Sequence, residues 1–139
     1  MIVEEQGGPL GVSVAGANLN DHKLLDATIA AIVVARPDPH EVEQHLCLDK
    51  GYDNQMSHEI VKKHGDIGHI RPVGEDRRGK RRPGRRKPRR WVVERTIGWW
   101  NRCRAILVRY DKKARNYLGL LQFACSLYWY RRLHRLGAT

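Results

Sequence analysis

The sequence predicts an α/β fold, because short strand-like runs alternate with helical patterns along the chain. Four apolar or β-branched runs are typical of strands, at residues 1–3, 10–15, 45–48 and 67–70. Helical patterns at residues 20–34 and 54–64 give the order strand, strand, helix, strand, helix, strand. With 139 residues, 41% of them hydrophobic, the chain can bury one core, so we expect one domain or a piece of one.

The first two strands are expected to form an antiparallel hairpin. The connection at residues 4–9 contains Gly7, Gly8 and Pro9, a composition typical of hairpin turns. The run at residues 1–3 starts abruptly, with no cap or turn before it. We therefore interpret the chain as one that begins inside a sheet, with an earlier strand missing upstream.

A helix is expected next. Asn20 and Asp21 are suited to cap a helix that runs to about Val34, before Pro37 and Pro39. Its buried side is expected to hold Leu24, Leu25, Thr28 and Ile32.

A strand, a helix and a further strand follow. Residues 45–48 are expected to form a short buried strand, and residues 49–53 a turn into a helix over about residues 54–64. Asp53 stands where a helix cap is needed, and Gly65 is the expected end of the helix.

Residues 71–90 form the most basic segment of the chain. They include eleven Lys or Arg and two acids, and so carry nine of the eleven net positive charges. With Gly and Pro interspersed, the segment cannot bury a core, so we expect a mobile basic loop. The pI of about 10.1 for the whole chain indicates a polyanionic partner.

Two helices are expected after the basic segment. Residues 91–107 show helical spacing, with one apolar stripe made of Val93, Ile97, Trp100, Cys103 and Leu107. A last helix over residues 113–133 is apolar on most sides and must pack into a core or against another chain. Its apolar run at residues 118–130 is shorter than the roughly 20 residues needed to span a bilayer, so no membrane partner is expected.

The cysteines and histidines predict neither disulfides nor a zinc site. Cys47, Cys103 and Cys125 are odd in number, far apart and set among apolar residues, which favours reduced core positions. No Cys-x-x-Cys pair or histidine cluster with zinc spacing is present, and we assign no histidine to a metal. Glu4 and Glu5 interrupt the first apolar run, so no signal peptide is expected and a cytoplasmic protein is favoured.

Two carboxylates are the candidates for chemistry. Asp49 follows the strand predicted at residues 45–48, and α/β sheets usually bind ligands at the carboxyl ends of their strands. Glu94 lies in the helix after the basic segment, beside Arg90 and Arg95. Acids close to a surface that binds a polyanion suggest a divalent cation between them and the phosphates. The alternatives are a turn-capping role for Asp49 and surface ion pairs for Glu94.

Three ordered motifs resemble the C-terminal half of the DDE transposases of bacterial insertion sequences. They are LGVSVAGAN at residues 10–18 with Asp21 just after, LDKGYD at residues 48–53, and RRWVVERT at residues 89–96. Arg109-Tyr110, Ala124-Cys125 and WYRRL at residues 129–133 also resemble the family's tail. The resemblance covers nearly the whole chain.

The resemblance implies a ribonuclease-H-like α/β domain over residues 1–139, a mixed sheet flanked by helices, truncated at its N-terminus so that the first strand is absent. In this family two aspartates and one glutamate hold two Mg²⁺ ions. By motif match, Asp49 is similar to the second aspartate, Glu94 to the glutamate, and Arg90 to an arginine of the same signature. No residue matches the first aspartate, so the resemblance implies an incomplete metal site and little or no strand cleavage by this chain alone.

The expected function is that of the C-terminal part of an insertion-sequence transposase, completed by an upstream segment or associated with a full-length transposase. The resemblance implies DNA as the partner, both transposon ends and target, in the bacterial nucleoid, and a homo-oligomer is a further candidate. The basic side chains expected to contact phosphates are Arg77, Arg78, Lys80, Arg81, Arg82, Arg85, Arg86, Lys87, Arg89 and Arg90. The alternative is a non-catalytic nucleic-acid-binding or regulatory protein derived from a transposase.

Overall fold

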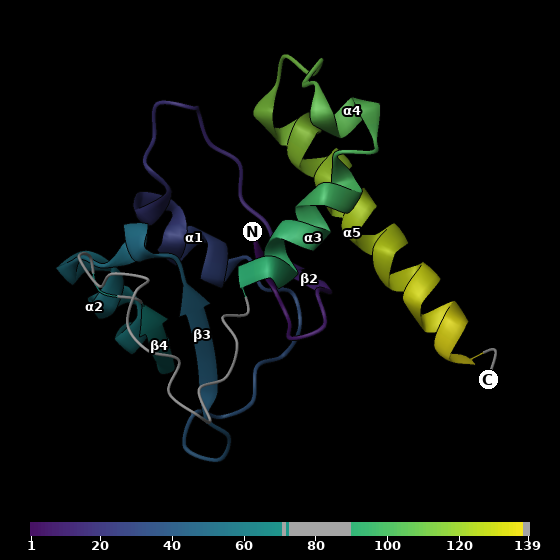
Figure 1. The fold of residues 1–139 in the computed structure, drawn as a ribbon. Coiled ribbons are helices and arrows are strands. Elements are labelled where there is room, and N and C mark those ends of the chain that lie inside the picture. Colours follow the sequence, from purple (N-terminus) through teal and green to yellow (C-terminus); the bar gives the residue numbers. More distant parts are fainter. Residues whose placement is uncertain (71, 73–89, 138–139) are drawn as a thin grey trace, which may run out of the picture.

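The computed structural model describes residues 1–70, 72 and 90–137 and shows a mixed α/β arrangement (Figure 1). Strands and helices follow one another in the order that the sequence predicts as far as residue 70. The strands are β1 (Ile2–Val3), β2 (Pro9–Gly11), β3 (Gln44–Leu48) and β4 (Asp66–Ile70). The helices are η1 (Asp21–Leu24), α1 (Leu25–Ala30), η2 (Lys50–Tyr52), α2 (Gln55–Lys63), α3 (Arg90–Trp100), α4 (Arg104–Leu107) and α5 (Ala114–Gly137).

The predicted hairpin is confirmed. Strands β1 and β2 pair in antiparallel fashion, and their turn is closed by Gly7, whose φ of +95° favours glycine. Strand β2 ends at Gly11, four residues earlier than expected. A Cβ atom at Gly11 would lie 2.9 Å from the Thr28 carbonyl oxygen, so glycine lets α1 pack directly on this strand.

The predicted strand, helix and strand after the first helix are also confirmed. Strands β3 and β4 are parallel, with a register that runs from Gln44 opposite Asp66 to Leu48 opposite Ile70. Helix α2 connects them and ends at Lys63, two residues before Gly65, which has the positive φ of +73° expected where a glycine follows a helix end. The cap of this helix is Asn54, whose side-chain oxygen accepts a hydrogen bond of 3.0 Å from the Ser57 N–H, and not Asp53.

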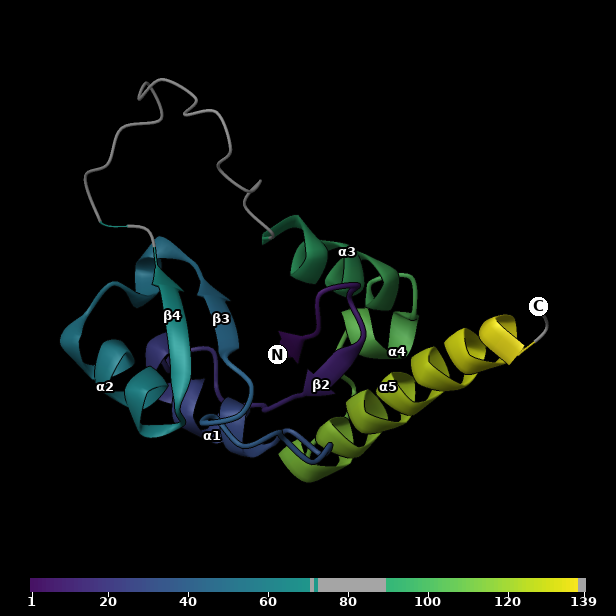
Figure 2. The same cartoon turned by 90° about the horizontal axis from the view of Figure 1, so that it is seen from below.

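The single mixed sheet expected from the sequence is replaced, among the described residues, by two sheets of two strands each. Figure 2 shows them as separate pairs, with α2 beside β4 and with α3 and α5 on the side of the hairpin. Both pairs nevertheless contribute to one hydrophobic cluster. Ile2 of β1 and Leu46 of β3 pack against its buried residues, which are Leu25, Ile29 and Val61. Strands β1 and β3 therefore share a core without pairing.

Strand β3 is half-buried, where a buried strand was expected. Leu46 and Leu48 face the cluster formed with α1 and α2, while His45 and Cys47 are exposed on the opposite face. Helices α1 and α2 cover only one face of the pair, and this is why the core position expected for Cys47 is wrong. All three cysteines are free thiols.

The first helix is shorter than predicted. A 3₁₀ turn, η1, leads into α1, which ends at Ala30 and not near Val34. The chain leaves the helix because the Val33 N–H donates to the Leu10 carbonyl of the neighbouring β2 strand, 3.3 Å away. Val33 is consequently 85% exposed.

The helix predicted over residues 91–107 is broken into α3 and α4, and its buried side differs from the predicted stripe. Val92, Thr96 and Trp100 are buried, whereas Ile97 is 43% and Leu107 58% exposed. The buried face is shifted by one residue because the Thr96 hydroxyl donates to the Gly7 carbonyl of the hairpin turn at 2.7 Å. A hydrophobicity pattern cannot reveal an anchor made by a hydroxyl.

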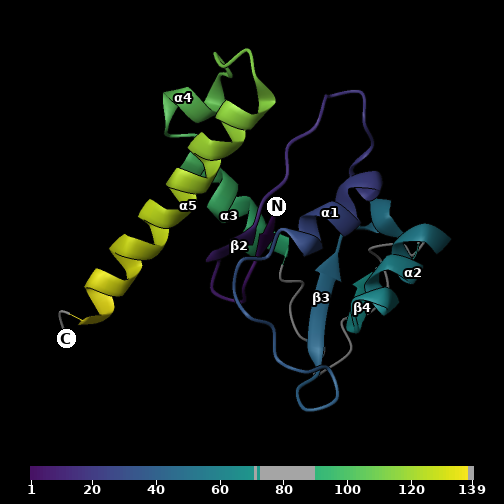
Figure 3. The same cartoon turned by 180° about the vertical axis from the view of Figure 1, so that it is seen from behind.

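The last helix, α5, crosses the hairpin side of the molecule and extends past it (Figure 3). With α3 and α4 it builds a second cluster, whose buried residues are Val12, Trp100, Ile106, Leu121 and Ala124. The helix is expected to be apolar on most sides, and some of its apolar side chains stay outside the cluster: Phe123 is 67% exposed. Among the described residues no helix is both long and apolar enough to cross a membrane.

Candidate active site

Asp49 lies directly after β3, at the turn into η2. Its Oδ1 accepts a hydrogen bond of 2.7 Å from the Lys50 N–H, so the carboxylate caps this short turn. The side chain is exposed at the carboxyl end of the strand. The capping role, which the sequence left open as an alternative, is therefore present, and it fixes the orientation of a carboxylate that still reaches the surface.

A second acid, Asp21, contributes to the electrostatic field at Tyr52, close to Asp49. Burial raises the pKa of Tyr52, and the negative charges of Asp21 and Asp49 raise it further. Two carboxylates distant in sequence thus act on one phenol. The motif resemblance includes Asp21 but gives no indication that it lies in the electrostatic reach of the turn that carries Asp49.

Glu94 lies on the exposed side of α3, between the buried positions Val92 and Thr96. Two hydrogen bonds set the place of this helix on the hairpin: Thr96 donates to the Gly7 carbonyl, and the Arg95 guanidinium donates to the Gln6 carbonyl. Arg95 also lies over the Trp91 ring, 4.7 Å from its centroid. The position of Glu94 therefore depends on the hairpin turn.

The hairpin turn is itself held by Glu4. Its carboxylate accepts hydrogen bonds from the Gln6 N–H at 2.8 Å, the Gly8 N–H at 2.7 Å and the Arg132 guanidinium at 2.6 Å. Burial disfavours the charged form, but these hydrogen bonds together outweigh it, so the pKa of Glu4 lies below its ordinary value. Trp129 adds a hydrogen bond of 2.8 Å from its indole N–H to the Pro9 carbonyl.

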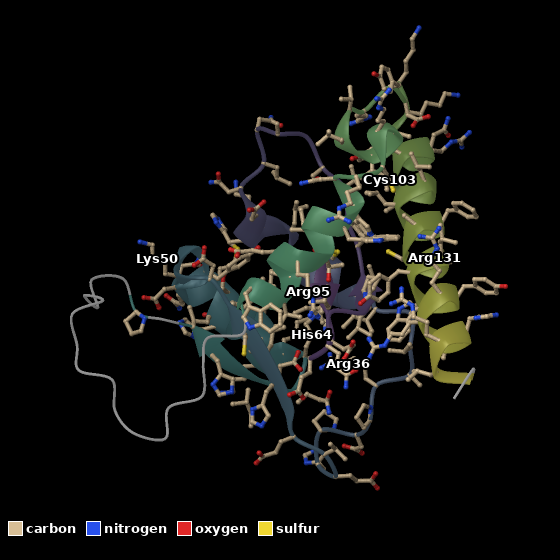
Figure 4. All side chains as sticks on the ribbon, turned by 45° about the vertical axis from the view of Figure 1, so that its right-hand side comes forward. Arg36, Lys50, His64, Arg95, Cys103 and Arg131 are labelled. Carbon is tan, nitrogen blue, oxygen red and sulfur yellow. The ribbon has the colours of Figure 1, made fainter. Side chains whose placement is uncertain are left out.

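Asp49 and Glu94 belong to different parts of the fold. Figure 4 labels their neighbours Lys50, on η2, and Arg95, on α3. Within residues 1–70, 72 and 90–137, no three His, Cys, Asp or Glu side chains are grouped so that they could hold a metal ion. The described residues thus offer oxygen ligands from separate elements and do not form a finished metal site.

The basic residues predicted to contact DNA are mostly outside the described part of the chain. Arg90 opens α3, one helical turn before Glu94. The predicted mobile loop and the remaining members of the set lie at positions that the structure does not describe, namely Arg77, Arg78, Lys80, Arg81, Arg82, Arg85, Arg86, Lys87 and Arg89.

A strand-end aspartate, a strongly basic segment and a helical glutamate on a mixed α/β chain are features of proteins that act on nucleic acid. The chain belongs to the transposase DDE domain family, whose sequence profile matches residues 46–131. Both candidate acids lie within that match. The family that the three motifs indicated is thereby confirmed.

A related protein extends the comparison. Over 97% of its length, the chain is 31% identical to a Burkholderia cepacia protein described as a putative transposase for insertion sequence element IS402. The chain spans 63% of the length of that relative. No solved structure matches the chain.

Proposed function

We propose that the chain is the C-terminal part of an insertion-sequence transposase, which cleaves and joins DNA strands with Mg²⁺ when an upstream segment completes it. The observation that carries the proposal is the family match over residues 46–131, since it includes Asp49 and Glu94. The greater length of the relative supports the need for a further segment, because the chain spans only 63% of it.

The two small sheets support a ribonuclease-H-like domain with one more strand. In the described residues, β1 pairs with β2 and β3 pairs with β4, while β1 and β3 meet only through their shared hydrophobic cluster. A strand that paired with both β1 and β3 would join the four strands into one mixed sheet. If this strand ran parallel to β3, its carboxyl end would lie beside Asp49. We assign the third carboxylate to that position.

The donor set fits Mg²⁺, which prefers the hard oxygens of carboxylates and phosphates. In this proposal Asp49 and Glu94 hold the ions, and the Lys50 N–H keeps the Asp49 carboxylate oriented. Two ions roughly 3.5–4 Å apart need bridging and flanking ligands, so two carboxylates are too few. When bound, such a metal pair activates the attacking water or 3′-hydroxyl and stabilises the leaving oxygen.

In the same proposal, the basic segment that ends at Arg90 binds the DNA phosphates. Lysines and arginines displace the counterions of DNA, which makes affinity strongly dependent on salt. The net charge of +11 supports this role. Since α3 begins at Arg90, the DNA contact would lead directly into the helix that carries Glu94.

The proposal is tested by supplying the missing strand. A first strand of the kind that the family resemblance implies, carrying the first aspartate, is fused before Met1, and Mg²⁺-dependent nicking of DNA that carries the element's ends is measured. We expect nicking by the fusion, and at least about a hundredfold loss in Asp49→Asn and Glu94→Gln, because each removes charge from the metal ligands. Glu59→Gln, which changes an exposed α2 acid bonded to Gln55, is the matched control and should nick normally.

A second candidate function is a non-catalytic DNA-binding regulator that associates with a complete transposase. The strong positive charge favours it, because that charge suffices for DNA binding without any metal. The same experiment separates the two. A fusion that binds DNA but does not nick it, or nicking that survives both Asp49→Asn and Glu94→Gln, would contradict the catalytic proposal and favour the regulator.

A further inference from the structure

The outer face of the β3–β4 pair carries three metal-ligating side chains of a type that the proposed function does not use. His45 and Cys47 alternate with the inward-facing leucines of β3 and are exposed, and His69 is exposed on β4. The parallel register places Cys47 directly opposite His69. His45 and His69, which are 24 residues apart in the sequence, are thereby brought into contact on neighbouring strands.

The two imidazoles meet through their ring nitrogens. His45 Nδ1 lies 3.0 Å from His69 Nε2, and the ring centroids are 5.1 Å apart. Two Zn–N bonds of about 2.0–2.1 Å at a tetrahedral angle separate the nitrogens by about 3.3 Å. A metal ion between the rings would therefore require the two nitrogens to move apart by only a few tenths of an ångström, with each ring turned so that its lone pair points at the ion.

Glu43 places a negative charge near His45. Its Oε2 lies 3.7 Å from His45 Nε2, the nitrogen that faces away from His69. This separation is too long for a hydrogen bond, so Glu43 does not fix the tautomer of His45. Its charge nevertheless favours a cation close to the two imidazoles.

We propose that this face binds a divalent transition metal of the Zn²⁺ class through His45 Nδ1 and His69 Nε2, with the Cys47 thiolate and water completing the coordination. Cys47 joins by rotation of its side chain, since no three ligands in the described residues are grouped as they stand. Its thiol loses its proton on binding, so one proton is released to solvent.

The chemistry of the donors distinguishes this site from the carboxylates. Imidazole and thiolate select zinc-like ions, whereas Mg²⁺ prefers oxygen ligands. The site uses neither Asp49 nor Glu94, and so it stands independently of the proposed catalytic role. Because it would join β3 to β4, metal binding should stabilise β3, the strand directly before Asp49.

The test is a titration of the full chain, without a purification tag, with Zn²⁺ by calorimetry and with Co²⁺ by absorption. We expect one Zn²⁺ per chain, no competition from excess Mg²⁺, and a rise in Tm with Zn²⁺. His45→Ala and His69→Ala should each weaken binding at least about tenfold, the lower limit typical of losing even an outer partner of a metal ligand. The matched control is His58→Ala, an exposed histidine paired with Asp53, which should bind as the parent chain does.

The proposal is overturned if the parent chain binds no Zn²⁺, if His45→Ala and His69→Ala bind it as tightly as the parent, or if His58→Ala weakens binding equally. Cys47→Ala tests the third ligand. Loss of the near-ultraviolet thiolate-to-cobalt band in this variant supports it, and an unchanged Co²⁺ spectrum contradicts it. Tm values measured without metal show that the variants are folded, so a loss of affinity is assigned to the ligand and not to unfolding.

Discussion

Thr96 shows how one hydroxyl determines which face of a helix is buried. It is 2% exposed, and its side chain bonds both to the Gly7 carbonyl at 2.7 Å and to the Val92 carbonyl at 3.2 Å. The sequence predicts an apolar stripe one residue away, at Val93 and Ile97, because hydrophobic periodicity gives no weight to a buried threonine. Both stripes fit a helix. Which face of the helix is buried is decided by the contact of Thr96 with Gly7, 89 residues away in the sequence.

Replacing Thr96 by valine tests this anchor. Valine keeps the shape of the side chain but leaves the Gly7 carbonyl without this donor in a buried place, so we expect a loss of about 1–3 kcal/mol in the free energy of unfolding. Urea unfolding measures it. Ser126→Ala is the control, because its hydroxyl makes the same kind of bond to the fourth residue before it on the exposed side of α5. If both substitutions lower the free energy of unfolding equally, the hydrogen bond from Thr96 to the hairpin turn does not contribute more than an ordinary exposed one.

The contact between His45 and His69 is a second feature at the level of single residues that the sequence does not predict. Metal ligands are recognised in a sequence by short spacings, and these residues are 24 positions apart. What brings them together is the register of a parallel pair, which depends on how α2 crosses between the strands. The strand-end position of Asp49 was predictable because it is visible in the sequence, whereas the contact between the two histidines was not.

At the scale of elements, the secondary structure up to residue 70 follows the sequence closely, since hairpin and crossover signals are local. The errors fall where one element ends against another. Helix α1 ends when Val33 bonds to Leu10, and the C-terminal helical pattern breaks between α3 and α4. Helix α5 runs four residues beyond its expected end. Helix ends therefore depend on partners that local propensity cannot show.

The hairpin turn between β1 and β2 is the element on which α3 and α5 both depend. A Cβ atom at Gly8 would clash with the Trp129 ring and would lie 2.9 Å from Glu4 Oε1. Gly8→Ala should therefore displace α5 from the turn and reduce the free energy of unfolding by about 1–3 kcal/mol. Chemical denaturation measures the loss.

Gly51→Ala is the matched substitution for Gly8→Ala, because a Cβ atom there meets nothing within 4 Å. Its stability should stay within about 0.5 kcal/mol of the parent chain. A Gly8→Ala chain as stable as Gly51→Ala would mean that the close packing of Trp129 on the turn contributes little.

At the scale of the whole molecule, the α/β class and the family were predictable from the sequence, while the division into two clusters was not. The sequence indicates which residues are apolar, but Met1 and Ile2 contact different clusters although they are neighbours. Tertiary geometry alone sets that division. Asp49 and Glu94 are both exposed, so both carboxylates are accessible for the role proposed above.

Two ionised carboxylates link the parts of the molecule and make its stability dependent on pH. Glu4 joins the hairpin turn to α5 through Arg132. Asp26 joins α1 to the end of α2 through His64 at 2.7 Å and Lys63 at 3.0 Å. Hydrogen bonds from His64 and then Lys63 lower the pKa of Asp26, and the pKa of Glu4 is lowered as well.

Since the folded-state pKa of each acid lies below the unfolded value, the stabilisation is complete above the unfolded pKa and is lost as the pH falls through the folded pKa. We expect the free energy of unfolding to fall as the pH drops below about 4.5, the ordinary value for glutamate. Urea unfolding at a series of pH values should show a shallower fall for Glu4→Gln and for Asp26→Asn. Glu41→Gln, in the exposed loop before β3, should show the same dependence of the free energy of unfolding on pH as the parent chain. If Glu4→Gln shows that same dependence, Glu4 is not a source of the pH-dependent stability.

The ion pair between Glu4 and Arg132 also has a consequence for synthesis on the ribosome. Its partners are 128 residues apart, so the turn that Glu4 holds can be locked by this ion pair only after Arg132 has been translated. The β3–α2–β4 crossover spans residues 44–70 and can pair much earlier. The crossover can therefore form early in translation, while the contact of the hairpin turn with α5 must wait until Arg132 has emerged from the ribosome.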